Sequence, residues 1–302
     1  MRITSGMIQR RVMADLNNVS ERLTNTQTKI ASNKELTRPS DDPFAVARAL
    51  SLRQDLGGIH RYQSTAEDAL GWQESTETSL ARMTEAVQRA RELTIHGGSD
   101  TSDSTARQAL ATEIDALIAG VKENANATYR GQYLFAGTET STPPYDLANE
   151  PPGVPDDGYR GNGGTVAREI GPGVSIQVNL TGAELLGSGG DGKLLHALRD
   201  IAQHLREGNA TELRGNDLKK LDASLNGLLD SRALNGARAN RVEAATTRLG
   251  QLEETTITQL SETEDADIAK QLIDFSSQQA AYQSALKAGA NIVQSSLMDF
   301  LR

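Results

Sequence analysis

The sequence predicts a mainly α-helical protein with a small β-rich insertion, built as an elongated helical rod with terminal coiled-coil helices. The positions of the eight prolines are the first observation, because residues 44–142 and 173–302 contain none. Proline in a helix interior costs about 3 kcal/mol, so these stretches permit long helices. The second observation is that apolar residues recur there at steps of three and four, which is the spacing of one helix face.

Composition argues against several classes of protein. Only 37% of the 302 residues are hydrophobic and 4% aromatic, which is little for a compact enzyme-like core. The net charge is -9 without a Lys/Arg cluster, so we expect no nucleic-acid binding. The absence of cysteine excludes disulfides and thiolate metal sites. No stretch is apolar enough for a membrane span or a secretory signal, and we expect neither.

The first predicted helix ends near Asn33, a residue type that tolerates the left-handed conformation that closes a helix. One apolar seam runs along it, interrupted by Thr26: Val12, Leu16, Val19, Leu23 and Ile30. A helix stop, a short loop and a restart then follow. The loop residues that indicate this are Pro39, which disfavours helix before it, the cap formers Asp41 and Asp42, and Pro43, which suits a first helical turn.

Further elements follow from the same signals. Helices are expected at about 43–96 and 104–128, followed by loop and short-strand composition from Tyr129. The segments TVAREI and VSIQVNL flank Gly-Pro-Gly and predict a β-hairpin. Helices are then expected at about 192–206, 211–229 and 233–301, the last as one continuous element.

A second apolar seam continues to the last residues of the sequence. Its members are Ile268, Leu272, Phe275, Tyr282, Leu286, Val293, Leu297 and Phe300. The two seams could pair inside one chain as an ordinary coiled coil, or they could pack between copies. An amphipathic helix at a free end has little else to cover it, and helices gain most of their stability from packing. This favours contacts between copies.

Five segments follow from these elements. We expect an N-terminal assembly segment at 1–42, the first half of the rod at 43–130 and a β-rich insertion at 131–190. The rod then returns over 191–240, and 241–302 forms the C-terminal rod and assembly helix.

No motif predicts catalysis, a cofactor or a metal. The segment Gly187–Lys193 fits the phosphate-loop pattern G-x-x-x-x-G-K, but Leu194 and Leu195 follow where a magnesium-binding hydroxyl is required. We interpret it as a flexible loop, with a nucleotide hydrolase as the alternative of a different class. The acidic run from Glu262 to Asp267 lacks the glycine and closing glutamate of a calcium loop. It is interpreted as a solvated face or a helix start.

Several stretches resemble the flagellin superfamily, and within it the hook-associated proteins of the hook–filament junction. MRITSGMI with the first seam resembles the N-terminal assembly helix of the family, and ELTRPSDDPFAVARAL resembles the loop that follows. DADIAKQLIDFSSQQAAYQSALKAGANIVQSSLMDFL resembles the C-terminal assembly helix. GQYLFAGTETSTPPY and LNGARANRVE agree as well. The sequence departs from the family at Asn33, where glycine is usual, and at Tyr145, where phenylalanine is more common.

The resemblance implies a flagellin-like rod whose terminal helices are largely unfolded in the free monomer and pack between many subunits as a tube. It implies a structural adaptor, not an enzyme, that joins the flagellar hook to the filament outside the cell. Export would use the flagellar type III channel without a cleavable signal. Partners would be neighbouring copies, the other hook-associated junction protein, flagellin and an export chaperone on the C-terminal helix. The alternative is flagellin itself, the bulk filament subunit.

Overall fold

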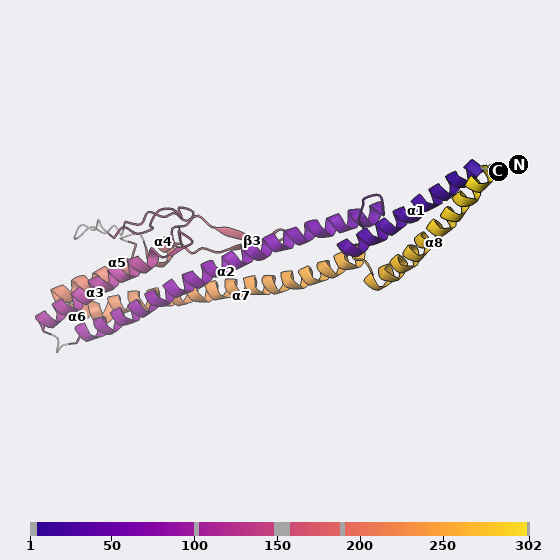
Figure 1. Ribbon diagram of the computed structural model, residues 1–302. Helices are drawn as coiled ribbons and strands as arrows, with labels where there is room; N and C mark the ends of the chain where they lie inside the picture. The colour runs from indigo at the N-terminus through magenta and orange to yellow at the C-terminus, as the bar shows by residue number, and fades with distance from the viewer. Residues whose placement is uncertain (1–4, 100–102, 148–157, 188–190, 301–302) are drawn as a thin grey trace. The chain divides into compact units, whose positions relative to one another are not determined.

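The computed structural model of the chain describes residues 5–99, 103–147, 158–187 and 191–300 (Figure 1). The chain divides into two compact units. The terminal unit consists of Met1–Gly58 and Leu252–Arg302, and the central unit is Ile59–Gln251. Two long helices pass through both, α2 (Pro43–Gly97) and α7 (Leu218–Glu264).

The remaining helices and strands are short or confined to one unit. The other helices are α1 (Ser5–Ser32), α3 (Ser104–Ala125), α4 (Gly182–Leu185), α5 (Leu194–Glu207), α6 (Ala210–Glu212), the π-helix η1 (Leu213–Asp217) and α8 (Ile268–Phe300). The strands are β1 (Thr128–Tyr129), β2 (Gln132–Tyr133), β3 (Ala167–Gly171) and β4 (Val174–Gln177). Helix therefore dominates and strands are few, which confirms the predicted fold class.

The core of the central unit forms around the inward stripe of α2. Leu80, Met83, Val87 and Ala90 are fully buried there, as their spacing predicts. Burying a leucine or methionine side chain contributes about 1.5–3 kcal/mol. Side chains from α3 and α5 complete the same cluster, including Ile114, Val121, Leu198 and Ile201.

Polar contacts fix α7 against α2 inside the central unit. The Asn235 side chain donates to the Gln73 carbonyl oxygen at 2.9 Å. Arg232 forms an ion pair with Glu77 at 2.7 Å. Asn235 belongs to the stretch LNGARANRVE, which the sequence relates to the flagellin superfamily, and Arg232 lies two residues before that stretch. Both contacts fix the position of α7 along α2.

The predicted hairpin is confirmed as the antiparallel pair β3–β4, in which Ala167 lies opposite Gln177 and Arg168 opposite Ile176. Gly173 in the turn has a φ of 67°, a left-handed conformation that favours glycine. The hairpin is tied to α2 by Arg168, whose Nε donates to Asp68 at 3.0 Å.

Three helix predictions are wrong: the end near 128, the separation between 229 and 233, and the continuity from 233 to 301. The helix expected to reach 128 ends at Ala125, because the Asn126 side chain bonds both the nitrogen and the carbonyl oxygen of Tyr145. The last helix is not continuous from 233 to 301. One helix runs through residues 229–233 to Glu264, and a break separates it from α8.

The break between α7 and α8 has a local signal and a distant cause. Asp267 caps the new helix, since its carboxylate accepts from the Lys270 nitrogen at 3.1 Å. Asp265 forms an antiparallel bridge with Lys34, far away in the sequence. The helix therefore ends where its backbone finds another partner.

Candidate assembly interface

Helices α1 and α8 of the terminal unit lie side by side and antiparallel (Figure 1). Lys34 pairs with Asp265 near one end of the two helices. Gly289 lies against Val12 and Leu16 near the other, and a Cβ on Gly289 would stand 3.1 Å from Val12 Cγ1. The two helices therefore approach closely at this glycine, and we call them the terminal helix pair.

The inner face of the pair contains the first predicted seam. All five predicted positions on α1 are partly buried: Val12, Leu16, Val19, Leu23 and Ile30. Thr26 between them is buried and donates from Oγ1 to Gln278 Oε1 at 2.9 Å. On α8, the predicted positions Ile268, Phe275 and Tyr282 are partly buried as well. The two seams therefore meet within one chain along this face.

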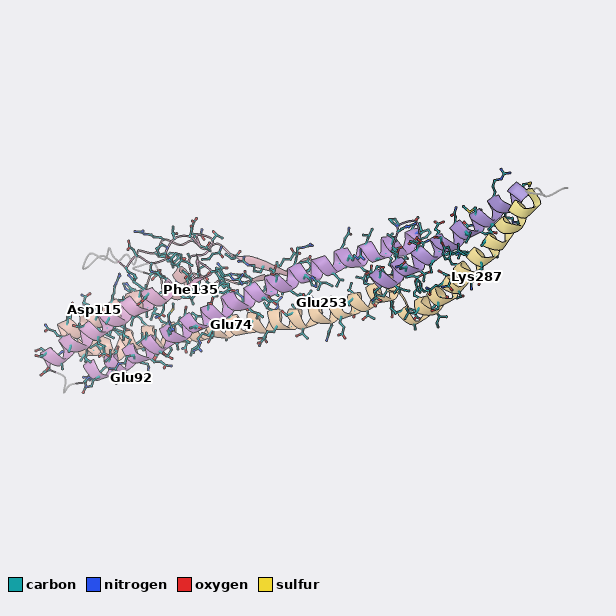
Figure 2. The ribbon with its side chains drawn as sticks, viewed as in Figure 1. Glu74, Glu92, Asp115, Phe135, Glu253 and Lys287 are labelled. Atoms are coloured by element: carbon teal, nitrogen blue, oxygen red, sulfur yellow. The ribbon has the colours of Figure 1, made fainter. Side chains whose placement is uncertain are left out.

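The other described positions of the second seam lie outside this contact. Leu272 is 50% exposed and Leu286 45% exposed. They are two heptads apart and so lie on nearly the same side of α8. We call these two residues the outer stripe. Figure 2 labels Lys287 on α8, the residue that follows Leu286 in the sequence. The predicted positions Val293, Leu297 and Phe300 belong to α8, but their side chains lie outside the described residues.

A polar cluster joins the ends of α1 and α7, and we call Lys34, Arg53, Glu264 and Asp265 the polar clamp. The Glu264 side chain is only 6% exposed and takes a cation on each oxygen. Lys34 Nζ lies 2.5 Å from Oε1 and Arg53 Nη2 lies 2.5 Å from Oε2. Lys34 also reaches Asp265 Oδ1 at 2.6 Å. A carboxylate this buried requires such partners.

The clamp shifts the pKa values of two of its members. The hydrogen bond from Lys34, followed by one from Ser261, lowers the pKa of Asp265 below 3.8. In return, the hydrogen bonds to Asp265 and then Glu264 raise the pKa of Lys34 above 10.5. Both shifts favour the charged forms and thus the ion pairs.

The loop from α1 to α2 contains the four predicted residues Pro39, Asp41, Asp42 and Pro43. The Asp41 carboxylate accepts from the Arg38 nitrogen at 2.8 Å and the Thr37 nitrogen at 3.1 Å. The Arg38 bond is the main cause of a lowered Asp41 pKa. Asp42 caps α2 by accepting from the nitrogens of Phe44 and Ala45, both at 3.0 Å.

Sequence reasoning missed the polar clamp. The acidic run from Glu262 to Asp267 was expected to be a solvated face or a helix start. Asp267 does start a helix, but Glu264 is buried, so a solvated face is wrong at that position. Its two cations are 211 and 230 residues away in the sequence, and no local pattern could identify them. The only local signal was the run of charged residues itself, which stands immediately before the second apolar seam begins at Ile268.

The segment that resembles a phosphate loop is described only in part, because residues 188–190 lie outside the description. Lys193 Nζ donates to the Ala183 carbonyl oxygen at 2.6 Å, so this lysine bonds to the backbone of its own unit. Within the described residues, no three His, Asp or Glu side chains are placed to hold a metal ion. None of the described helices is long and apolar enough to span a membrane.

Comparison with known proteins agrees with this architecture. Residues 3–140 match the bacterial flagellin N-terminal helical region, and residues 218–301 match the bacterial flagellin C-terminal helical region. Flagellar hook-associated protein 3 of Salmonella typhimurium is 26% identical over 332 residues, which cover 100% of both chains. Flagellin of Bacillus subtilis is 27% identical over 293 residues, 91% of each chain.

A solved structure shows the same fold. The flagellar junction protein FlgL from Legionella pneumophila superposes with a TM-score of 0.59 over 72% of this chain and 99% of that one, at 16% identity. The two flagellin regions together cover both terminal helices, α2, α3 and all of α7. The chain belongs to the flagellin superfamily.

Proposed function

We propose that this chain is a structural adaptor that joins the flagellar hook to the flagellin filament and assembles through its terminal helix pair. The observation that supports it most directly is the outer stripe. Leu272 and Leu286 are about half exposed on a helix whose neighbouring face packs on α1. Covering the rest of each leucine would contribute about 1 kcal/mol. The gain is repeated in every subunit of a tube.

The partner on the outer stripe is a neighbouring copy in this proposal. A contact between two different faces of identical subunits continues into an open helical array instead of closing as a dimer. A short tubular zone between the hook and the filament requires this kind of contact. At its two edges, the hook-side faces would contact the other hook-associated junction protein and the filament-side faces would contact flagellin.

The adaptor is favoured over flagellin by two observations. A relative that matches over the whole of both chains is a hook-associated protein. The loop PSDDP and the stretch LNGARANRVE resemble the hook-associated branch. The flagellin of Bacillus subtilis has a similar identity over slightly less of each chain, so flagellin remains the second candidate.

Export and localisation complete the proposal. The subunit would leave the cell through the flagellar type III channel and act outside it. Before export, a chaperone would cover the half-exposed leucines of α8, which otherwise invite non-specific association. The role is structural and needs no catalytic group.

Electron microscopy separates the two candidates. The purified protein would be placed in polymerising salt alone and then with isolated hooks. An adaptor stays monomeric alone and adds only a short zone to hook ends, whereas a flagellin forms long filaments without hooks.

A pair of variants then tests the interface. Leu286→Asp should abolish addition to hooks while the central unit stays folded. Leu229→Asp is the matched control, because Leu229 is 44% exposed on α7 in the central unit. Normal addition of Leu286→Asp would show that the outer stripe is not the interface.

A further inference from the structure

Within the central unit, α2 and α7 each carry a seven-residue repeat of buried positions. On α7, every seventh residue from 221 to 249 is at most 2% exposed, and only one of them is polar: Leu221, Leu228, Asn235, Val242 and Leu249. On α2, the buried repeat that contains Gln73 is Ala66, Gln73, Leu80, Val87 and Thr94. Buried residues at this spacing are typical of helices that pack along their length as a coiled coil.

The alignment of the two helices follows from three polar contacts: Asn235 with Gln73, Arg232 with Glu77, and Asp222 with Arg91. Residue numbers fall along α7 as they rise along α2, so the helices run antiparallel. The side chains of the two ion pairs are between 33% and 46% exposed, where water screens their attraction and such pairs contribute little. The buried contact at Asn235 is therefore the one that can determine the alignment.

Gln73 and Asn235 together concentrate unpaired polar atoms in the buried seam, and we call these two residues the polar layer. Asn235 Nδ2 donates to the Gln73 carbonyl oxygen at 2.9 Å. Asn235 Oδ1 and both amide atoms of the Gln73 side chain are buried without a hydrogen-bond partner among the described residues. Such atoms lower stability, and they are satisfied most readily when they lie together, because one enclosed water can bond about three of them.

We propose that the polar layer specifies the register in which α7 packs on α2, at a cost in stability. A shift of α7 by one repeat would keep apolar positions opposite each other over most of the seam. It would move Asn235 opposite Leu80 or Ala66, however, and divide the polar atoms of the layer between two apolar layers. One polar position in an apolar seam fixes register in other coiled coils for this reason. The inference goes beyond the adaptor role, because it concerns the central unit of a single subunit.

Cysteine pairs and a short bifunctional maleimide read the register in the purified full-length protein, since the chain has no cysteine of its own. Glu77→Cys is combined with Arg232→Cys to report the observed register. It is combined with Ala239→Cys or Leu225→Cys to report a shift by one repeat in either direction, which is about 10.5 Å along a helix. All three pairs lose the ion pair of Glu77 equally.

With the polar layer intact, we expect crosslinking from residue 77 to residue 232 and to neither of the other two positions. Replacing the layer by Gln73→Leu together with Asn235→Leu should add product at 239 or 225, at least about a tenth of that at 232. Denaturant titration of the same double variant without the cysteines should show a higher midpoint, because both polar partners are replaced by apolar groups.

The matched control is Thr94→Val, which removes a buried hydroxyl from the same position of the α2 repeat, three repeats from Gln73. It should leave crosslinking confined to residue 232. Three results would overturn the proposal: crosslinking of the double variant at 232 alone, a denaturation midpoint of the double variant at or below that of the wild type, or shifted product in Thr94→Val. None of these measurements involves hooks, so failure of the adaptor role would be seen separately.

Discussion

The two units use the same apolar spacing with different results. In the central unit, the stripe of α2 is fully buried at Leu80 and Met83, because α3, α5 and the insertion supply side chains to one cluster. In the terminal unit, α8 packs on α1, and Leu272 and Leu286 remain about half exposed. Periodicity therefore shows which residues can be buried, while the number of surrounding elements decides which are buried within one chain. We therefore propose that the terminal unit is the part that other copies complete.

The largest expected effect is a difference in stability between two leucine substitutions, one in each unit. Leu198→Ala removes a fully buried side chain from the central cluster and should lower the free energy of unfolding by about 2–5 kcal/mol. Leu272→Ala should lower it by less than about 1 kcal/mol in the monomer, since half of that side chain already contacts water. Denaturant titration monitored by circular dichroism compares the two. Equal losses of unfolding free energy in the two variants would contradict the claim that the core is complete in the central unit and incomplete in the terminal unit.

A smaller effect is expected where α1 and α8 come closest. Gly289→Val adds a branched side chain where a Cβ would already stand 3.1 Å from Val12 Cγ1. Overpacking of this kind costs about 1–3 kcal/mol. Hydrogen exchange should therefore rise in residues 12–19 and 282–289, with the central unit unaffected. Gly236→Val, on a helix position with open space around it, is the control.

A still smaller effect is expected at the turn out of α1. Asn33→Gly should change stability by only a few tenths of a kcal/mol, because glycine adopts the left-handed conformation freely. Asn33→Ala should cost about 1 kcal/mol for the same backbone. Thermal unfolding of the two variants against the wild type measures both. If Asn33→Ala were more stable than the wild type, the left-handed conformation at residue 33 would not be required.

The smallest effect is the pH dependence of the clamp, because the side chains of Lys34 and Asp265 remain about a third exposed, so that water screens their charges. The lowered pKa of Asp265 means that its contribution is present above pH 3.8 and is lost as pH falls through the lower folded value. The raised pKa of Lys34 means that its contribution is present below pH 10.5 and is lost as pH rises through the higher folded value.

Other charges face the same two groups: Lys29, Glu35, Arg53 and Glu264. We therefore expect opening of the clamp to be rarest on the plateau between the two losses. Amide exchange at Ala266, corrected for intrinsic rates and followed across pH, measures this. Faster opening in the middle of that range than at either edge would contradict it.

Local chemistry made part of this structure predictable from sequence. Asp42 and Pro43 define the start of α2 by a cap and a first-turn proline, and Asn33 ends α1 with a left-handed residue. The hairpin follows from two strand-like segments around Gly173. Each of these features is decided by neighbours in the sequence, which is why the sequence alone predicts them.

What could not be predicted depends on partners far along the chain. The break after Glu264 is stabilised by Lys34 and Arg53, which belong to the other end of the sequence. The second seam was treated as one face, yet Tyr282 is partly buried and Leu286 remains half exposed. Periodicity cannot distinguish these two positions, because both satisfy the same spacing.

Chemical accessibility of the outer stripe tests the central claim most directly. The chain has no cysteine, so Leu286→Cys introduces a single thiol, with Leu229→Cys as a control of similar exposure in the central unit. Alkylation would be timed in the monomer and after addition to isolated hooks. We predict that the thiol at 286 reacts readily in the monomer and becomes protected on assembly. Equal rates at 286 before and after assembly would contradict the claim that neighbouring copies cover this stripe.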